Sequence, residues 1–387
     1  MNIADIFKNL FNQSGFAHFP WQNAVMIVIA LFFLFLGIKK KFEPLLLVGI
    51  AFGMLLTNLP GADIYHNELW TGKNIDYGEV MAHGGLLDIL YIGVKTSVYP
   101  CLIFMGVGAM TDFGPMLANP KSLILGAAAQ LGIYLALILG VAIGFSGNLA
   151  AAVAIIGGAD GPTAIYVTKT LAPESLGPIA IAAYSYMALI PLIQPPIMRL
   201  LTTKKERLIK MEAPKQVSKT VKIIFPIAVT IITALLLPSV APLLGCLMLG
   251  NLFKESGVTA RLSDTAQNSL MNTVTILLGI SVGATAQASV FLKLETLAII
   301  ALGLLAFIFA TAGGVLFGKL LCWITKGKIN PLIGSAGVSA VPMAARVSEV
   351  EGRRYDPDNH LLMHAMGPNV AGVIGSAVAA GFLLSLF

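Results

Sequence analysis

One carboxylate lies within a segment that is otherwise apolar enough to cross a bilayer. Asp160 stands in the run IIGGADGPTAI, which extends from Ile155 to Ile165, with two glycines before it and a Gly-Pro pair after it. An ionisable side chain at membrane depth costs roughly 3 kcal/mol or more unless it meets a cation, a proton or water. Glycine and proline break a helix and free backbone carbonyls beside the acid. The pattern therefore indicates a site for a small cation, centred on Asp160.

A second apolar segment with the same kind of interruption, NPLIGSAGVSAVP, starts at Asn330. Asn330 and Ser339 offer neutral oxygens, and glycines such as Gly334 expose carbonyls and permit close approach. Tight helix packing is the alternative role for these glycines. One carboxylate with several neutral oxygens suits a hard monovalent cation such as Na⁺. Asn369, in the run HAMGPNVAG of the last span, is either a further oxygen ligand or the cap of a broken helix.

Three further side chains fit chemistry beside such a site. Arg346 follows the second broken segment, and it is either an interface anchor or a bidentate partner for a carboxylate on the cytoplasmic side. Tyr184 and Tyr186 lie deep in one span, so either phenol is a candidate proton donor, although tyrosines near membrane interfaces are usually anchors. We expect Asp88 and Lys95 to pair with each other in a structural role.

The composition predicts an integral membrane protein. Of 387 residues, 57% are hydrophobic and only 11% are charged, whereas soluble domains carry about 25% charged residues. The first apolar run, 23–38, lacks the basic start and the cleavage site of a signal peptide and is predicted to be a span. The net charge of +6 gathers at span ends and excludes a nucleic-acid footprint. The three cysteines lie in apolar runs without CxxC spacing, which argues against disulfides and metal clusters.

Windows of about 20 apolar residues predict an all-α, polytopic protein with about ten spans. The predicted spans are 23–40, 44–59, 86–112, 122–146, 176–200, 222–237, 240–253, 268–292, 296–324 and 361–386. By the positive-inside rule, the basic stretches at 39–41 and 202–222 are cytoplasmic, and the acidic loop at 59–79 suits the outer face. Counting crossings then makes 148–171 a re-entrant hairpin entered from outside, and 330–347 a re-entrant hairpin entered from the cytoplasm.

The two halves of the chain resemble each other. FMGVGAMT from Phe104 matches LGISVGAT from Leu278, and Pro-Leu-Leu recurs at Pro44 and Pro242. Because the first half starts outside and the second starts inside, we interpret this as an inverted-topology repeat, whose ion site forms where broken helices of both halves meet. The alternative is chance similarity between spans rich in Gly, Ala and Leu. The predicted division is a first membrane repeat at 1–201, a basic cytoplasmic linker at 202–221 and a second membrane repeat at 222–387.

Four motifs, in this order, resemble the β subunit of the biotin-dependent sodium-pumping decarboxylases, which include the oxaloacetate, methylmalonyl-CoA and glutaconyl-CoA enzymes. The motifs are GGADGPT from Gly157, YSYM from Tyr184 with QPP from Gln194, GVSAVP from Gly337 with ARV from Ala345, and MHAMGPN from Met363. The resemblance covers nearly the whole chain. It implies a multi-pass protein of a prokaryotic cell (inner) membrane that decarboxylates carboxybiotin and couples this reaction to Na⁺ export from the cytoplasm, with consumption of a proton.

The resemblance also implies roles and partners. The implied Na⁺ ligands are Asp160, Asn330, Gly334, Ser339 and Asn369; Arg346 would hold carboxybiotin, and Arg346, Tyr186 and Asp160 would act in catalysis. Biotin would come from a partner, because the chain has no Met-Lys-Met attachment motif. The implied partners are a carboxyltransferase (α) subunit, a biotin carrier protein or domain and a small membrane subunit (γ or δ), with further copies of this chain as an open option and no nucleic acid.

Two other functions account for part of the pattern. A stand-alone Na⁺/H⁺ antiporter explains Asp160 and the repeat, but it gives no reason for Arg346 or for the four motifs. A non-catalytic membrane anchor for a soluble complex leaves the polar, glycine-broken segments unexplained. Which carboxylic acid or acyl-CoA is consumed is decided by partner subunits and cannot be read from this chain.

Overall fold

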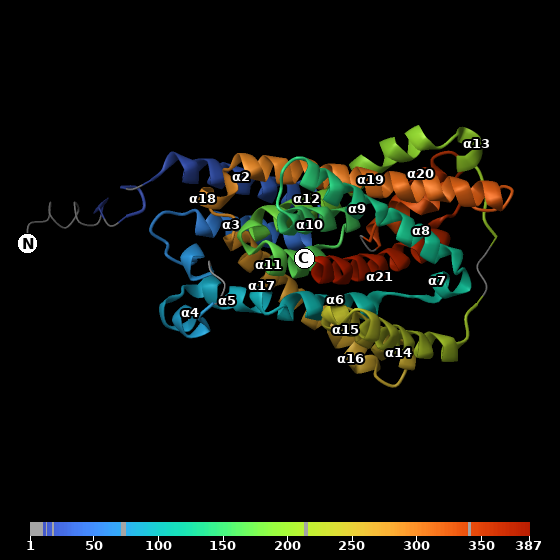
Figure 1. Ribbon diagram of the computed structural model, residues 1–387, viewed down its shortest axis with the longest axis horizontal. Helices are drawn as coiled ribbons and strands as arrows, with labels where there is room; N and C mark the ends of the chain where they lie inside the picture. The colour runs from blue at the N-terminus through green and yellow to red at the C-terminus, as the bar shows by residue number, and fades with distance from the viewer. Residues whose placement is uncertain (1–10, 13, 18, 71–74, 213–215, 340–341) are drawn as a thin grey trace, which may run out of the picture.

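The computed structural model describes residues 11–12, 14–17, 19–70, 75–212, 216–339 and 342–387. Within these ranges the chain is helical and no β-strand is assigned, so the predicted all-α class is confirmed. The helices lie side by side in an elongated bundle (Figure 1). One end of the bundle carries α4 (Tyr77–His83) and α5 (Leu86–Lys95), and the opposite end carries α13 (Lys204–Arg207) and α20 (Met343–Arg353).

Several of the described helices are long and apolar enough to cross a membrane. By length and composition these are α2 (Trp21–Ile38), α8 (Lys121–Ala129) with α9 (Leu131–Ala142), α14 (Lys219–Leu236), α19 (Leu294–Ile324) and α21 (Leu362–Leu386). The total of five rises to seven if two bent pairs count as one span each: α5 with α6 (Val98–Met110), and the two parts of α12 (Leu176–Leu201). These helices are those of a membrane protein, and the count of about ten spans stays a prediction.

The helices that remain are shorter. They are α3 (Pro44–Thr57), η1 (Asn67–Trp70), α7 (Gly114–Ala118), α10 (Gly147–Ala154), η2 (Ile155–Gly158), α11 (Gly161–Leu171), η3 (Pro173–Ser175), η4 (Pro238–Val240), α15 (Ala241–Ser256), α16 (Ala260–Thr265), η5 (Ala266–Leu270), α17 (Met271–Ala284), α18 (Ala288–Phe291) and η6 (Pro331–Gly337). Many of them are too short to cross a bilayer alone, since a span needs about 20 residues. They fill the interior and build the interrupted segments.

One predicted span is bent, and another is shifted along the chain. The predicted span 86–112 matches the pair of α5 and α6, which meet at 62° beside Ser97, whose backbone is left-handed (φ 69°). The span 268–292 begins earlier and ends earlier, as the continuous run of α16, η5 and α17 from 260 to 284. Its first turns are polar and exposed, with Asn268 Nδ2 donating to Asp264 Oδ1 at 2.8 Å, so a search for apolar windows misses them.

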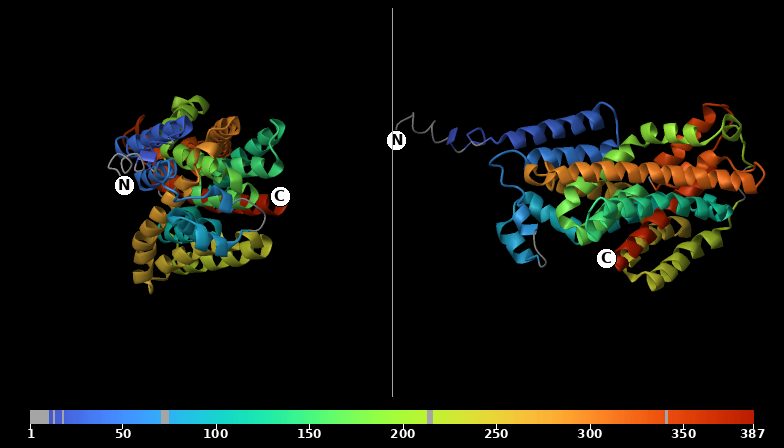
Figure 2. Two further views of the ribbon diagram at one scale, coloured as in Figure 1. Left: turned by 90° about the vertical axis from the view of Figure 1, so that its left-hand side faces the viewer. Right: turned by 45° about the horizontal axis from the view of Figure 1, so that its top comes forward.

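Two pairs of short helices, α3 with α17 and α6 with α15, pack so closely that their backbones touch at glycines. α3 packs on α17, where a Cβ on Gly283 would lie 2.0 Å from the carbonyl oxygen of Ile50. α6 packs on α15, where a Cβ on Gly108 would lie 1.8 Å from the carbonyl oxygen of Leu247. Glycines at such crossings allow the close approach that packing in a membrane depends on. Figure 2 shows the same helices from two further directions.

The two interrupted segments end in different parts of the bundle. The first runs through α10, η2 and α11, and it ends where Lys169 Nζ donates to the carbonyl of Lys95, at the junction of α5 and α6. The second runs through η6 and α20. It begins where Asn330 Nδ2 donates to the carbonyl of Arg207, and it is followed by Asp356, which pairs with Lys210 at 2.9 Å. The second segment therefore starts and ends beside the basic loop after α12.

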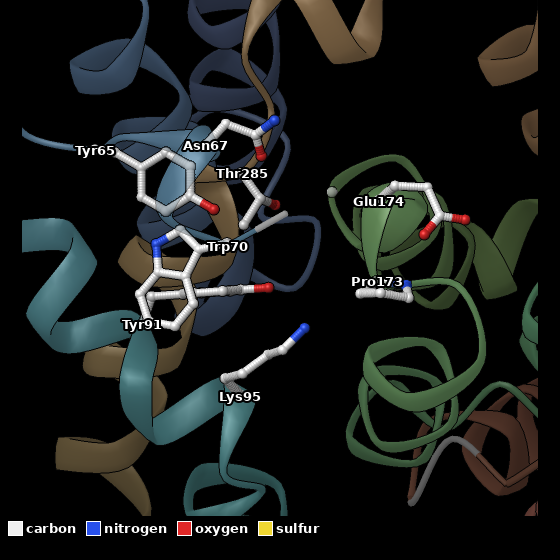
Figure 3. Close-up of a pocket in the computed structure, with 9 residues that line it drawn as sticks. Tyr65, Asn67, Trp70, Tyr91, Lys95, Pro173, Glu174 and Thr285 are labelled. Atoms are coloured by element: carbon white, nitrogen blue, oxygen red, sulfur yellow. The ribbon is translucent and has the colours of Figure 1, made fainter. Parts of the chain in front are cut away.

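A buried carboxylate holds the loop that precedes α5. Asp88 accepts hydrogen bonds from Trp70 Nε1 at 2.7 Å, from His66 Nδ1 at 2.8 Å and from the backbone nitrogens of His66 and Gly85. The predicted pairing of Asp88 with Lys95 is therefore wrong, because these donors occupy its oxygens. Lys95 instead extends into a pocket of about 120 Å³, across from Glu174 and beside a wall of aromatic rings (Figure 3).

The contact between His66 and Asp88 predicts a pH-dependent loop. The hydrogen bond to Asp88 raises the pKa of His66 above its usual value of about 6.5. A raised pKa in the folded state stabilises the loop fully below about pH 6.5, and this stability is lost as the pH rises through the raised pKa. We expect backbone amides at 66–70 to be better protected from hydrogen exchange at pH 6 than at pH 8, after correction for intrinsic rates. His66→Gln removes this difference; if the difference persists in that variant, another group titrates.

Candidate functional site

Asp160 lies at the point where the first interrupted segment changes direction. η2 ends at Gly158, Ala159 is left-handed (φ 51°), and Asp160 is extended in the N-cap position of α11. Pro162 lies in the first turn of α11, where a missing N–H group costs nothing. The positive end of a helix favours a negative charge at this position. A left-handed non-glycine residue is uncommon, and such strain clusters at functional sites.

The Asp160 carboxylate is buried among neutral donors. It is 7% exposed, and its Oδ2 accepts hydrogen bonds from Thr163 Oγ1 at 2.7 Å and from Ser376 Oγ at 2.8 Å. Its Oδ1 accepts only a long bond of 3.4 Å from the backbone nitrogen of Thr163. Within the described part of the chain, Asp160 forms no ion pair. A buried carboxylate with neutral partners alone leaves its charge to be balanced by a cation or a proton.

The second interrupted segment reaches the same place. The backbone nitrogen of Ser339 donates to the carbonyl of Gly158 at 3.0 Å, which ties the two segments together beside Asp160. The Ser339 hydroxyl is buried and faces the Asp160 carboxylate without a well-formed hydrogen bond. Asp160, Ser339 and Tyr184 line one cavity of about 130 Å³, which has room for a cation with a few waters. The structure thus brings Asp160 and Ser339 together, as the sequence predicts.

The structure separates the two candidate tyrosines. Tyr184 lines the cavity, and its buried hydroxyl has no hydrogen-bond partner among the described residues. Its ring packs so closely on Gly161 that a Cβ there would lie 2.1 Å from a ring carbon. Tyr186 instead donates to the carbonyl of Ile300 on α19. Residues two apart on a helix point in nearly opposite directions, so only one of the two can face Asp160, and that residue is Tyr184.

Three predicted ligands, Asn330, Gly334 and Asn369, are not among the residues that line this cavity. Asn330 caps η6 by accepting from the backbone nitrogen of Leu332 at 3.0 Å, and its amide group donates to the carbonyls of Arg207 and Ile209. Gly334 packs on α19, where a Cβ would lie 2.0 Å from the carbonyl oxygen of Gly314. Asn330 and Gly334 both fix the shape of the second interrupted segment, and neither lines the cavity that holds Asp160.

Asn369 anchors the second interrupted segment through its amide nitrogen, whereas its role as an oxygen ligand stays a prediction. Its Nδ2 donates to the carbonyls of Ala336 and Val338 at 2.9 and 3.0 Å, so it fixes the end of η6. Its Oδ1 is buried without a hydrogen-bond partner in the described part of the chain, as are Gln130 Oε1 and Gln194 Oε1. Gln194 donates to the carbonyl of Ser335 at 3.0 Å, also in the second segment. Unpaired buried amide oxygens are costly, and they are ligands that hard cations use.

Arg346 carries a free charge on the surface of α20. Its side chain is exposed and forms no ion pair or hydrogen bond with the residues that the structure describes. Arg353 and Arg354 are exposed near the end of the same helix, whereas Glu351 is buried and pairs with Arg199 through two bonds of 2.6 Å. One turn before Arg346, Met343 lines the cavity of Asp160. α20 therefore connects the cavity to an unpaired guanidinium at the surface.

Three residues near Asp160 are not predicted from the sequence: Thr163, Ser376 and Glu43. Thr163 stands three residues after Asp160, and a residue at this spacing faces the N-cap side chain, so the sequence did contain its signal. Ser376 lies in an apolar span, where a hydroxyl usually bonds to its own helix, and no local pattern marks it. Glu43 lines the cavity but precedes Pro44 at the start of α3, a common helix-start pattern that conceals other roles.

Comparison with known proteins decides the family. The family model described as the Na⁺-transporting oxaloacetate decarboxylase beta subunit matches residues 22–387. The chain belongs to this family. The family predicted from the four motifs, GGADGPT among them, is therefore confirmed.

Three curated relatives show how broad this family is. The chain is 57% identical to the glutaconyl-CoA decarboxylase subunit beta of Acidaminococcus fermentans, over 98% of this chain and 96% of the relative. It is 57% identical to the methylmalonyl-CoA decarboxylase subunit beta of Veillonella parvula, over 98% of this chain and 97% of the relative. It is 50% identical to the oxaloacetate decarboxylase beta chain of Klebsiella pneumoniae, over 96% of each. High identity thus extends to β subunits of enzymes that are named for three different substrates.

Proposed function

We propose that this chain is the membrane subunit of a Na⁺-pumping decarboxylase. In this proposal it decarboxylates carboxybiotin presented by a partner subunit and uses the released free energy to export Na⁺ from the cytoplasm, with uptake of one proton. The observation that carries the proposal is the Asp160 carboxylate, which is buried among neutral hydroxyls in a cavity shared by both interrupted segments. Membership of the family, whose relatives are named as decarboxylase β subunits, supports the same function.

The cation site is proposed at Asp160. Its Oδ1 is the less occupied oxygen, and the Ser339 hydroxyl is a neutral ligand from the opposite segment. Asn369 Oδ1, on α21 and next to the second segment, offers a further oxygen. Asn330 and Gly334 act in this proposal by holding the shape of that segment rather than by contact with the cavity of Asp160. One carboxylate and neutral oxygens leave no excess charge around a bound Na⁺.

Carboxybiotin is proposed to bind through Arg346. A guanidinium can hold the N-carboxylate with two parallel hydrogen bonds, and this guanidinium has no competing partner among the described residues. Decarboxylation breaks the bond between the biotin nitrogen and the carboxylate carbon, releases CO₂ and leaves the electron pair on nitrogen. That nitrogen then takes one proton. We propose Tyr184, rather than Tyr186, as the proton relay, because Tyr184 lines the cavity of Asp160 and Tyr186 bonds to Ile300. The proposed catalytic set is then Arg346, Asp160 and Tyr184.

Asp160 can couple the two ions because it carries one negative charge. Bound Na⁺ favours the ionised carboxylate, and departure of Na⁺ favours its protonation. The residue therefore exchanges a cation for a proton without leaving an unbalanced charge in the membrane interior. The tie between Ser339 and Gly158 supports a single site that both segments share.

Reciprocal contacts support an inverted-topology repeat. The same offset along the chain relates Ile50 to Leu247 and Gly53 to Gly250. Gly53 packs on the carbonyl of Ile280, and Gly250 packs in the same way on the carbonyl of Met105. α12 packs along α19 just as α21 packs along α8. We therefore propose two repeats, 1–201 and 222–387, joined by a cytoplasmic linker at 202–221, with about ten spans and with re-entrant hairpins that enter from opposite faces.

The partners in this proposal follow from chemistry that the chain itself does not carry. A carboxyltransferase (α) subunit, a biotin carrier and a small membrane subunit (γ or δ) complete the enzyme, in the cell membrane of a prokaryote. Relatives of similar identity are named for glutaconyl-CoA and methylmalonyl-CoA, so the substrate is assigned to the partners.

Transport of ²²Na⁺ into inside-out vesicles tests the function directly. With the complete complex and its carboxyl donor, we expect ²²Na⁺ uptake that stops when the donor is consumed, together with decarboxylation that requires Na⁺. A stand-alone antiporter would instead move ²²Na⁺ in response to a pH gradient without any carboxyl donor. Decarboxylation at an equal rate with and without Na⁺ would refute the proposed coupling.

Arg346→Lys should lower the rate constant for carboxybiotin decarboxylation by roughly tenfold, the equivalent of about 1.4 kcal/mol and close to one charge-assisted hydrogen bond. An ammonium group cannot reproduce the two-point contact of a guanidinium. The assay measures decarboxylation of a carboxylated biotin carrier by the complex at saturating Na⁺. Arg354→Lys is the matched control, because Arg354 is also exposed next to α20 and lies two turns farther from Met343. A wild-type rate in Arg346→Lys would mean that Arg346 contributes only general positive charge, because lysine keeps the charge; equal losses in both variants would mean that the effect is not specific to Arg346.

A further inference from the structure

Glu43 places a second carboxylate in the cavity that holds Asp160. It occupies the N-cap position of α3, yet its side chain makes no capping hydrogen bond. Its backbone is left-handed (φ 38°), a conformation that residues other than glycine rarely adopt. Such strain persists only where the surrounding structure imposes it. Glu43 is therefore not an ordinary helix cap. Its side chain instead lines the cavity that holds Asp160.

The Glu43 carboxylate is half-buried and has no partner among the residues that the structure describes. The three lysines at 39–41 are all exposed, and none forms an ion pair with Glu43 within the described part of the chain. Glu43 lines the same cavity as Asp160, Ser339 and Tyr184. The Tyr184 ring lies within electrostatic range of both carboxylates, so the two acids share one neighbour. A half-buried carboxylate that forms no ion pair with three nearby lysines is available to a cation from outside the chain.

The rest of the cavity makes a cation the fitting occupant. Two acids that face one small space repel each other unless a positive charge lies between them. The other walls are largely apolar and include Phe104, Met187 and Met271. Low-dielectric walls strengthen the attraction of the acids for a cation. The buried hydroxyls of Tyr184 and Ser339, which lack well-formed hydrogen bonds, belong to residues that line the same cavity and add neutral oxygens there.

We propose that Glu43 is an entry site for Na⁺. Its carboxylate attracts Na⁺ from the cytoplasm into the cavity, and the ion then moves on to Asp160. The turn that carries Glu43 directly follows the lysines at 39–41, which the positive-inside rule assigns to the cytoplasm. This assignment rests on the proposed function, because it takes Na⁺ export as given. Glu43 is a positioning residue: it raises the occupancy of the site at low Na⁺ and takes no part in breaking the bond of carboxybiotin.

The test is the Na⁺ dependence of decarboxylation by the complete complex. Glu43→Gln should raise the half-saturating Na⁺ concentration about tenfold, the lower end of what charge focusing provides, and should leave the rate at saturating Na⁺ within about twofold of wild type. Glu43→Asp keeps the charge on a shorter side chain and should raise the half-saturating concentration only about twofold to threefold. Glu212→Gln is the control for net charge, because Glu212 is exposed in the basic cytoplasmic loop outside the cavity.

Each outcome decides the proposal. A wild-type Na⁺ dependence in Glu43→Gln would overturn it, and so would a loss of activity that saturating Na⁺ does not restore, because Glu43 would then act in the chemical step or in folding. If Glu43→Gln does not assemble, Glu43→Asp carries the test, and an unchanged half-saturating concentration overturns the assignment. If the wild-type complex decarboxylates without any need for Na⁺, the proposed function fails, and this result is separate from any effect of Glu43.

Discussion

Asp160→Asn abolishes Na⁺-dependent decarboxylation, with a rate lower by about 100-fold or more, while the protein still inserts into the membrane. The amide has nearly the same shape as the carboxylate, and the hydroxyls of Thr163 and Ser376 can turn to accept from it. The fold therefore survives, but the site loses the charge that holds Na⁺ and the group that takes up a proton. A loss of this size is the range expected for removal of a positioned acid or base.

Two companion variants make this result specific. Ser376→Ala removes one donor from Asp160 and should shift the Na⁺ dependence while the maximal rate stays measurable, because the carboxylate remains. Asp264→Asn changes an exposed acid on α16 and should behave as wild type. The measurements are the decarboxylation rate over a range of Na⁺ concentrations and ²²Na⁺ uptake into vesicles. Full activity in Asp160→Asn would refute the assignment of the cation site.

Gly334→Ala should unfold the second interrupted segment or lower the melting temperature of the purified protein markedly. A Cβ at this position would lie 2.0 Å from the carbonyl oxygen of Gly314, and a Cβ on Gly314 would lie 2.1 Å from the carbonyl oxygen of Gly334. Both obstacles are backbone atoms of packed elements, so neither can rotate away. Overpacking of this kind costs about 1–3 kcal/mol, and sometimes more. Gly245→Ala is the control, because a Cβ on Gly245 meets no atom within 4 Å.

The same experiment separates packing from ligation at Gly334. If the glycine is required for packing, Gly314→Ala should be as destabilising as Gly334→Ala, although Gly314 belongs to neither interrupted segment. Gly245→Ala should leave stability unchanged or raise it by up to about 1 kcal/mol, since alanine is the better helix former. A Gly334→Ala protein that melts like wild type would refute the packing argument, and a changed Na⁺ dependence in that stable protein would instead favour a role of this position at the ion site.

The sequence predicts the parts of the site that depend on breaks in a helix. Asp160 and Ser339 each stand within two residues of a glycine in an apolar run, and the structure brings them together because such breaks expose polar atoms in the interior. The choice between Tyr184 and Tyr186 needs packing, because helical spacing shows that they face apart but not which of them faces inward. Ser376 needs the tertiary fold too, since its partner Asp160 is more than 200 residues away in the chain.

The errors in the predicted helices have local causes. The break between α5 and α6 falls at Ser97, where neither glycine nor proline marks a turn, and only the packed structure imposes the left-handed backbone. The run from α16 into α17 begins with polar residues such as Asp264, which a hydropathy window rejects although they continue the helix. Asp88 pairs with His66 and Trp70, which lie on the loop before it, rather than with Lys95, which follows two helical turns later.

The hydrogen bond from Ser339 to Gly158 consists of backbone atoms alone. Substitution of either side chain leaves its donor and its acceptor in place, because each belongs to the peptide chain. This hydrogen bond, which joins the two interrupted segments, should therefore survive most single-residue substitutions. In the proposed function, Na⁺ that leaked back through the site would dissipate the free energy of decarboxylation. We therefore expect Na⁺ leaks to arise from substitutions that displace a whole segment, and seldom from substitutions at Ser339 or Gly158. Gly161 is one such position, because it packs tightly against the ring of Tyr184.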